Sequence, residues 1–399
     1  MNSQVISNRM ARVFKAVAPV TRFLNESSWA QRVGDPTVSD FVFGNPQEMP
    51  LQGFVEALAK ANVPENKDWY AYKNNEPESR AIVAADLRKR RGLAFEEEDI
   101  FLTNGAFAAL SVTLCTLLNP GDEVIFISPP WFFYEALIVT YDGTPVRVKA
   151  TPESFDLDLE AIAAAITDHT KAIIVNSPNN PTGKIYPPST LSRLADLLTE
   201  ASRKNGHPIY LLSDEAYSRI IFDGHDYPSP VTFYPHSFLI YTYAKTLLTP
   251  GQRIGYIALP PTMPAPNRKL LREAIFGAQI VAGWAFPNAL LQHALPDIER
   301  LSIDIPHLQR KRDRLVSALR DIGYGVHVPE GTFYLMVRAP WDDDLAFTDL
   351  LAAHNILCLP GDVVEAPGYF RLSLTANDTM IDRALPGFAA AHQHATAKT

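Results

Sequence analysis

Three charged side chains follow apolar runs of the chain and could do chemistry together. Asp214 ends one apolar run, Lys245 follows another, and Arg253 comes eight residues after the lysine. A lysine at the end of a buried strand is costly unless it is bound covalently, paired or neutral. The pattern therefore predicts a lysine that binds a ligand, although Asp214 on its own would be interpreted as a helix N-cap.

An asparagine and two turns could complete such a site. Asn180 lies in a loop, residues 176–183, which two prolines and a glycine make rigid. Gly105 opens a predicted helix, where backbone N–H groups could approach an anion such as phosphate. Trp131 follows two prolines and could stack on a ligand or belong to the core. Each of these signals is weak alone.

Several common catalytic motifs are absent from the sequence. The ten histidines show no spacing typical of metal ligands, so we expect no dedicated metal site. The sequence also lacks GxSxG, GxxxxGK[ST] and GxGxxG. Hydrolase, kinase and simple dehydrogenase functions therefore lack their most direct sequence evidence.

The elements that must position these residues alternate between strand and helix patterns. Such alternation predicts a mainly parallel sheet covered on both faces, with ligands at the carboxyl ends of its strands. We predict strands at 99–103, 123–128, 144–149, 171–176, 208–214, 237–242 and 253–259, and helices at 106–118, 157–166 and 188–205.

The pattern changes on either side of this region. From about Pro264, long helical patterns with breaks near Pro287 and Pro296 precede strands at 332–337 and 369–374, which predicts a smaller α+β lobe. The first 24 residues carry four basic and no acidic side chains, as a transit peptide does, but they lack an uninterrupted apolar region and a cleavage signal. We interpret them as a surface helix that ends near Pro19.

Composition narrows the class of protein. With 36 Lys+Arg against 44 Asp+Glu, the formal charge of −8 argues against sequence-independent nucleic-acid binding. The only two cysteines, Cys115 and Cys358, can form no disulfide framework and are expected to be buried thiols. No apolar run approaches the ~18–20 residues that span a bilayer. The basic run 88–91 is expected to end a helix. We expect a cytoplasmic globular protein with no membrane partner.

Taken in order, these segments closely resemble the class I/II aminotransferases, the aspartate-aminotransferase-like branch of the fold-type I enzymes that use pyridoxal 5′-phosphate (PLP). The resemblance covers nearly the whole chain. It implies an α/β fold with a large domain, whose mainly parallel sheet is sandwiched by helices, and a smaller α+β domain. The implied division is an N-terminal arm, or part of the small domain, over 1–45, a large PLP-binding domain over 46–285 and a small C-terminal domain over 286–399. The segments that carry it are Gly105-Ala106-Phe107, Trp131, Asn180-Pro-Thr-Gly183, Asp214-x-x-Tyr217, Thr242-x-x-Lys245, Arg253 and Arg371.

The resemblance assigns roles around the cofactor ring. Lys245 would hold PLP as an imine and later shuttle a proton, and Asp214 would pair with the pyridine nitrogen. Tyr217 and Asn180 would hydrogen-bond the phenolic oxygen, and Trp131 would stack on the ring and contact substrate.

The resemblance also assigns anion sites. The phosphate would be held by Gly105, Ala106, Phe107, Thr242 and Arg253. Ala106 and Phe107 stand where relatives often carry hydroxyls, so fewer side-chain donors are expected here.

Arg371 would clamp the substrate α-carboxylate with help from Asn180, and Gly44 would lie in the segment that closes over it. The loop over 360–369 is shorter than in relatives and lacks their phenylalanine, which leaves the rim of the pocket open to question.

One assigned residue would act across a subunit boundary. Tyr70 fits the tyrosine that reaches the phosphate of the neighbouring subunit, with Tyr72 as its rival and Asn75 in place of the usual glycine. This implies a homodimer with shared sites.

The implied activity is transfer of an amino group between an amino acid and a 2-oxo acid. Two alternatives keep the fold: another PLP reaction (decarboxylation, elimination or cyclisation) and a non-enzymatic regulator. Aromatic pocket walls are expected, and no cationic residue can be assigned to a second carboxylate, which leaves a dicarboxylic substrate open. The wall candidates are Phe43, Tyr72, Trp131, Tyr134 and Phe333.

Overall fold

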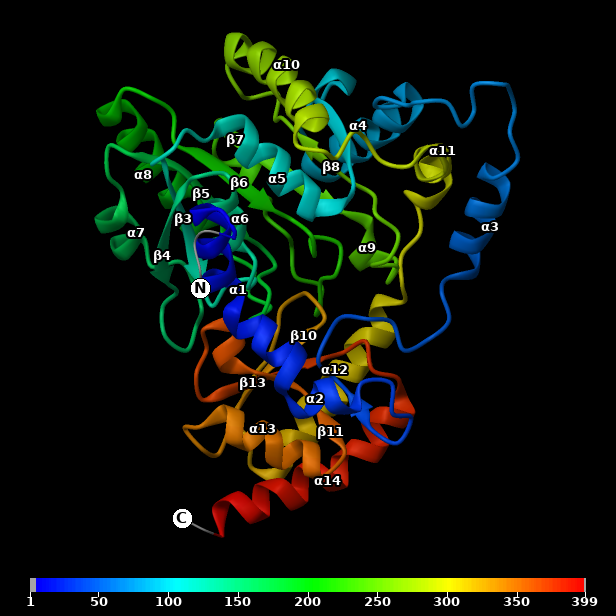
Figure 1. The fold of residues 1–399 in the computed structure, drawn as a ribbon, viewed down its shortest axis with the longest axis vertical. Coiled ribbons are helices and arrows are strands. Elements are labelled where there is room, and N and C mark those ends of the chain that lie inside the picture. Colours follow the sequence, from blue (N-terminus) through cyan, green and yellow to red (C-terminus); the bar gives the residue numbers. More distant parts are fainter. Residues whose placement is uncertain (1–4, 398–399) are drawn as a thin grey trace.

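The structure, a computed structural model, describes residues 5–397 and divides into two lobes (Figure 1). The large lobe is built on a seven-stranded sheet, and the small lobe on a four-stranded one. The predicted transit-like stretch begins with residues 1–4, which lie outside the described residues. Within the described chain, no helix is long and apolar enough to cross a membrane.

The large sheet confirms the predicted alternation. Its strands follow the order β2-β8-β7-β6-β5-β3-β4, and β8 runs antiparallel to both of its neighbours while all other pairs are parallel. The parallel strands therefore end at one edge. The strands are β2 (Ile100–Thr103), β3 (Glu123–Ser128), β4 (Thr144–Lys149), β5 (Thr170–Asn176), β6 (Tyr210–Asp214), β7 (Ser237–Thr242) and β8 (Gly255–Ala258).

Successive residues of a strand lie on opposite faces of the sheet, and each face is packed against a different set of helices. In β3, Val124 and Phe126 belong to the cluster under α5 and α10, whereas Ile125 and Ile127 belong to the cluster under α7 and α8. This period of two places an apolar side chain on both faces, as a doubly covered sheet requires. The covering helices are α5 (Gly105–Leu117), α6 (Tyr134–Thr140), α7 (Leu159–Ala165), α8 (Pro188–Asn205) and α10 (Ala265–Val281).

A third group of helices packs against the β2–β8 side of the large lobe. Residues of α3 (Gln52–Ala61), α4 (Pro77–Arg91) and α11 (Ala289–Ile298) share one core cluster with β2, β7 and β8. The division at 285/286 stays a prediction, because α11 lies beyond it in sequence yet packs with α3 and α4.

The small lobe is an α+β unit, as predicted. Its antiparallel sheet has the order β12-β13-β10-β9, and β1 pairs with β11 beside it. The N-terminal arm is therefore joined to the C-terminal part of the chain. The elements are β1 (Ser39–Asp40), α12 (Ile305–Ile322), β9 (Val326–His327), β10 (Tyr334–Arg338), α13 (Asp344–Ala353), β11 (Ile356–Leu357), β12 (Leu359–Pro360), β13 (Tyr369–Ser373) and α14 (Asp378–Thr396).

Two predicted helix breaks are wrong. Pro19 lies inside α1 (Asn8–Glu26), and Pro296 lies inside α11. Proline removes one helical hydrogen bond, but tertiary contacts outweigh this loss where the flanking apolar face is buried. Val20 and Phe23 provide that face in α1. Of the two cysteines, Cys358 is buried as expected, whereas Cys115 is only partly buried.

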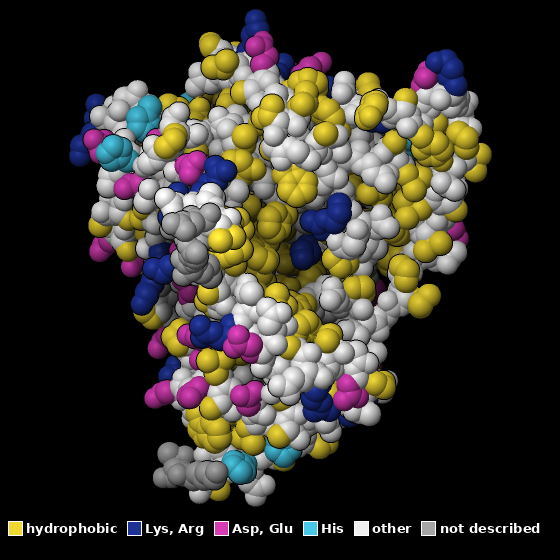
Figure 2. Space-filling model, in the orientation of Figure 1, with side chains coloured by type: hydrophobic (Ala, Val, Ile, Leu, Met, Phe, Trp, Pro, Cys, Tyr) yellow, Lys and Arg dark blue, Asp and Glu magenta, His cyan; other side chains and the backbone are white. Residues whose placement is uncertain are grey.

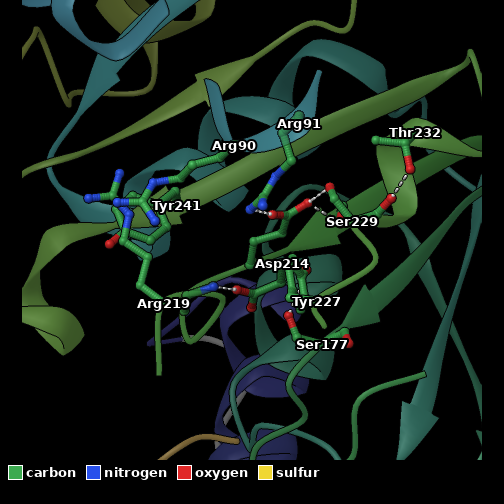
Figure 3. A network of polar contacts seen from close by, with 12 residues as sticks. Arg90, Arg91, Ser177, Asp214, Arg219, Tyr227, Ser229, Thr232 and Tyr241 are labelled. Carbon is green, nitrogen blue, oxygen red and sulfur yellow. Dashed lines mark hydrogen bonds and ion pairs between the residues drawn. The ribbon is translucent and has the colours of Figure 1, made fainter. Parts of the chain in front are cut away.

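A buried ion pair holds the strand end that carries Asp214. Helix α4 ends at Arg91, as predicted, but this side chain turns inward, and its Nη2 lies 2.6 Å from Glu215 Oε2. The two side chains are 9% and 0% exposed. Glu215 also accepts hydrogen bonds from Ser213 and Ser229, and in Figure 3 Arg91 and Ser229 converge close to Asp214. The residue after Asp214 is thus tied to another helix.

We expect Arg91→Ala to lower the free energy of unfolding by about 3–5 kcal/mol, because it leaves the Glu215 carboxylate buried without its partner. Arg90→Ala is the matched control, since Arg90 pairs with Asp86 at the surface and such pairs contribute about 0–1 kcal/mol. Urea unfolding of both variants measures the difference. Equal losses would show that the buried pair does not anchor this strand end.

Candidate active site

A cavity of about 470 Å³ opens between the two lobes, at the carboxyl ends of the parallel strands. Figure 2 shows this hollow, whose walls are largely hydrophobic. Most of the residues that the sequence singled out line it together: Gly44, Ala106, Phe107, Trp131, Asn180, Asp214, Tyr217, Thr242, Lys245, Arg253 and Arg371.

Lys245 is placed in the cavity by the end of β7. Thr242 caps the short helix α9 (Tyr243–Thr246) by accepting a hydrogen bond from the Ala244 N–H, which turns the chain into the cavity directly after the strand. The Lys245 Nζ lies 5.6 Å from the ring centroid of Tyr217 and 5.7 Å from that of Phe333. Among the described residues no carboxylate forms an ion pair with it. Its amino group is therefore held over aromatic faces rather than by an acid.

Asp214 ends β6 and is 5% exposed. Its Oδ2 accepts a hydrogen bond from the Tyr134 hydroxyl at 2.5 Å, and its Oδ1 accepts one from the Ala216 N–H at 3.2 Å. Burial raises the pKa of Asp214. A turn rather than a helix follows, so its interpretation as a helix N-cap is wrong. The sequence predicts Tyr134 only as a residue of the pocket wall, and nothing in it indicates that the hydroxyl reaches a carboxylate 80 positions away.

Arg371 presents a buried guanidinium that no described carboxylate pairs with. The residue is 1% exposed. It donates from Nη1 to Asn180 Oδ1 (3.0 Å) and from Nη2 to the Val42 carbonyl (2.9 Å). Its Cζ lies 3.8 Å from the ring centroid of Tyr334. Its Nε is buried without a partner. Burial lowers the pKa of Arg371. A buried charge of this kind is costly unless an anion is bound.

A second cationic corner forms around the start of α5. Gly105 has φ +79°, and a Cβ there would lie 2.9 Å from Arg253 Nη2 and 3.4 Å from Thr242 Oγ1. Arg253 also donates to the Pro250 carbonyl at 2.8 Å. Burial lowers the pKa of Arg253. The corner therefore joins a guanidinium, a hydroxyl and a helix N-terminus, a set suited to an anion.

Gly44 and Tyr217 complete the small-lobe side. A Cβ on Gly44 would overlap the ring of Phe333 and lie 2.9 Å from the Tyr334 hydroxyl, so this close approach requires glycine. Tyr217 is buried edge-on against Phe333, and burial raises its pKa, which keeps the hydroxyl protonated as a donor.

Some predicted residues lie elsewhere. Tyr70 is 53% exposed, donates to the Asn62 carbonyl at 2.6 Å and does not line the cavity, and Tyr72 is exposed throughout. A role across a subunit boundary for Tyr70 stays a prediction. Asn75 accepts a hydrogen bond from the Leu102 N–H at 2.6 Å and so ties the loop after Tyr72 to β2.

The N-terminal helix supplies lining residues that sequence reasoning missed. Helix α1 runs between the two lobes (Figure 1), with Val20 and Phe23 in the small-lobe core beside Val363 of the short 360–369 loop. The prediction of a surface helix is therefore wrong for this face. The lining residues that the sequence did not single out include Val20, Leu24, Trp29, Phe132, Phe133 and Tyr334, and the expected wall residue Phe333 is not part of the lining.

The sequence profile of the family "Aminotransferase class I and II" matches residues 37–387. This chain belongs to that family. The aspartate/prephenate aminotransferase of Thermus thermophilus is 32% identical over 343 residues, which cover 84% of this chain and 86% of the relative. The arginine–pyruvate transaminase of Pseudomonas aeruginosa is 30% identical over 352 residues, 86% of this chain and 84% of that one.

Solved structures agree with the fold of this aminotransferase. An aminotransferase from Eubacterium rectale superposes with a TM-score of 0.86 at 30% identity, covering 98% of this chain and 96% of that one. A mutant aspartate aminotransferase of T. thermophilus gives 0.83 at 27% identity, covering 97% and 99%. The predicted fold class and the predicted transferase activity are confirmed, and neither alternative activity is supported.

Proposed function

We propose that this aminotransferase binds PLP in the cavity between its lobes and holds it covalently through the Lys245 amino group. One observation carries the proposal: a lysine that no described carboxylate pairs with, a buried carboxylate and two guanidinium groups, of which that of Arg371 is buried, line the same cavity. PLP is an aldehyde with a dianionic phosphate and a basic ring nitrogen. The cavity offers an amine, a cationic corner and a carboxylate, so the residues present fit the group.

Asp214 would act on the ring nitrogen. Burial disfavours its charged form, and a cation beside it would restore that form. Tyr134 keeps one carboxylate oxygen in place through its hydrogen bond and acts as a positioning residue. When bound, the protonated ring supplies an electron sink for charge that develops at the substrate Cα.

Lys245 would also act as a general base, because a lysine amine in this cavity can move the proton at the substrate Cα. Tyr217 and Asn180, which line the same cavity, would donate to the phenolic oxygen, and Trp131 on the cavity wall would cover the flat ring.

Arg371 would orient the substrate. Its unpartnered Nε and its fork of N–H donors suit the α-carboxylate, and Asn180 stabilises the fork from the large lobe. Because Asn180 and Arg371 come from different lobes, substrate binding would also join the lobes.

The phosphate would lie in the corner made by Gly105, Ala106, Phe107, Thr242 and Arg253. Only Thr242 and Arg253 offer side-chain donors there, so the N–H groups at the start of α5 must provide the rest.

The active unit would be a homodimer. Helix α10 and the residues after it expose Ile280, Val281 and Trp284, and the Trp284 carbonyl accepts a hydrogen bond from Asn104, next to the phosphate corner. Tyr70 is also exposed. A second copy that covered this face would reach the cavity and could receive Tyr70.

We also propose a cytoplasmic location. Both cysteines are free, which suits a reducing compartment. Fractionation of the producing cells would test it.

Lys245→Ala should abolish trapping of the cofactor by borohydride and lower the transamination rate by at least about 10³-fold. Lys149→Ala is the control, because Lys149 also ends a strand but is exposed and outside the cavity. Mass spectrometry of the reduced protein detects the adduct. An adduct that persists in Lys245→Ala would place the attachment on another lysine.

Gly105→Ala should weaken binding of PLP by at least about tenfold, because the new methyl displaces the Arg253 guanidinium. Gly206→Ala is matched: its φ is +73°, but nothing lies within 4 Å of the added atom. Both variants should lose about 1 kcal/mol of unfolding free energy, because alanine is strained at a positive φ. Only Gly105→Ala should lose the preference for PLP over pyridoxal. Equal affinities for PLP would contradict the phosphate corner.

Tyr70→Phe should weaken cofactor binding by about tenfold through loss of a hydrogen bond to a charged group. In a hybrid dimer of Tyr70→Phe with Lys245→Ala subunits, one site has an intact lysine and an intact tyrosine from its neighbour. That site should bind PLP with native affinity, whereas a tyrosine acting within its own subunit leaves every hybrid site impaired. Tyr72→Phe is the control and should change nothing.

A further inference from the structure

The cavity that Arg371 lines also has an apolar wall of two halves. One half belongs to the large lobe and is formed by Phe107, Trp131, Phe132 and Phe133; the other comes from the N-terminal arm and is formed by Val20, Leu24, Trp29 and Phe43. Figure 2 shows hydrophobic side chains over much of the hollow, with Lys and Arg side chains at one side. The substrate side chain must lie here, because Arg371 would hold the α-carboxylate at one end of the same cavity.

Ring packing makes the large-lobe half rigid. The Phe107 ring centroid lies 5.1 Å from that of Trp131, with the rings at 87°, and 5.5 Å from that of Phe133. The Trp131 and Phe133 centroids are 5.3 Å apart. Edge-to-face packing of this kind holds each ring in one orientation.

The N-terminal half is held in a similar way. The rings of Trp29 and Phe43 meet edge-on with centroids 5.2 Å apart, and Phe23 stacks on Trp29 at 5.9 Å. The Trp29 indole N–H also donates to Asp40 at 3.1 Å. Both halves are therefore preformed.

Every charged side chain in the cavity lining already has a task. Four such residues line it, and the proposed function uses all four: Asp214, Lys245, Arg253 and Arg371. Within the described chain, no further lysine or arginine lines the cavity.

The basic residues of α1 face away from the cavity. Arg9 and Arg12 form ion pairs with Asp142 at 3.2 and 3.3 Å. Lys15 and Arg22 line a different cavity, between α1 and α13. The helix therefore turns its apolar side to the substrate.

From this wall we infer that the aminotransferase takes an amino acid with a large apolar side chain as its donor, and releases the corresponding 2-oxo acid. The inference rests on the proposed function, because it takes Arg371 as the α-carboxylate clamp. A second carboxylate would be buried against aromatic rings with no cation of this chain beside it, at a large cost in affinity. A large apolar side chain would bury its surface there instead.

The holoenzyme, mixed with one amino acid at a time, provides the test. The change in the visible cofactor band gives kcat/KM of the half-reaction for alanine, leucine, phenylalanine, aspartate and glutamate. We expect leucine and phenylalanine to exceed aspartate and glutamate by at least about tenfold. A kcat/KM for aspartate or glutamate that equals or exceeds the values for leucine and phenylalanine would overturn the inference. The same result is expected if the neighbouring subunit supplies a cation.

The result with alanine distinguishes a wrong substrate class from a wrong proposed function. If alanine is converted to its 2-oxo acid but the large apolar donors have no advantage over aspartate, only the substrate class is wrong. If none of the five amino acids is converted, the proposed function fails and the substrate class with it.

A pair of variants on α1 makes the test specific to the wall. Leu24→Lys places a cation in the cavity, and should lower kcat/KM for phenylalanine and raise it for aspartate, each by at least about tenfold. Met10→Lys is matched, since Met10 is 39% exposed against 38% for Leu24, lies on the same helix and is outside the cavity lining. It should change neither value. Equal effects of the two variants would overturn the assignment of α1 to the substrate wall.

Binding without reaction gives an independent readout. 3-Phenylpropanoate and succinate match phenylalanine and aspartate without their amino groups, and calorimetry measures the dissociation constant of each with the holoenzyme. We expect 3-phenylpropanoate to bind at least about tenfold more tightly. Tighter binding of succinate would overturn the inference even if rates are limited by another step.

Discussion

The buried guanidinium of Arg371 is the feature on which the arrangement of the two lobes depends. It is 1% exposed, no described carboxylate neutralises it, and its donors reach Asn180 of the large lobe and the Val42 carbonyl of the N-terminal arm. A charge in this position is costly in the free protein. The surrounding packing must therefore hold it in place, and an anionic substrate recovers part of the cost by binding. Three distant parts of the chain meet at this one side chain, so substrate binding and the relation of the lobes are linked.

The arginines in and near the site of this aminotransferase fall into two groups. Arg91 and Arg219 are paired with the carboxylates Glu215 and Glu299, each at 2.6 Å, and neither lines the cavity. Arg253 and Arg371 line the cavity, and among the described residues they donate only to neutral acceptors. Paired cations stabilise the framework, whereas unpaired cations keep donors free for a ligand. This difference, which depends on no relative, supports the two anion sites proposed for Arg253 and Arg371.

The N-terminal helix contributes to the cavity. Helix α1 packs on α6 and on the short 3₁₀ helix Gly361–Val364, and its residues Val20 and Leu24 line the cavity. This part of the rim is therefore built from segments more than 300 positions apart in sequence. Relatives named for aspartate share the fold and the family, and the preference proposed here for a large apolar side chain rests on the wall that includes α1. Under this proposal, the junction of arm, large lobe and small lobe would determine the choice of substrate.

The sequence by itself determined the sheet and the order of chemical groups along its edge. Strands of a doubly covered sheet read as apolar runs, and parallel strands end at one edge, so Asn180, Asp214 and Lys245 were predictable neighbours. Tertiary structure alone decided the rest. The Tyr134–Asp214 hydrogen bond, the inward turn of Arg91 to Glu215 and the passage of α1 through Pro19 depend on contacts between segments that local patterns do not relate. Which face of a helix is buried follows from what packs against it, and the partner of α1 is formed by residues far along the chain.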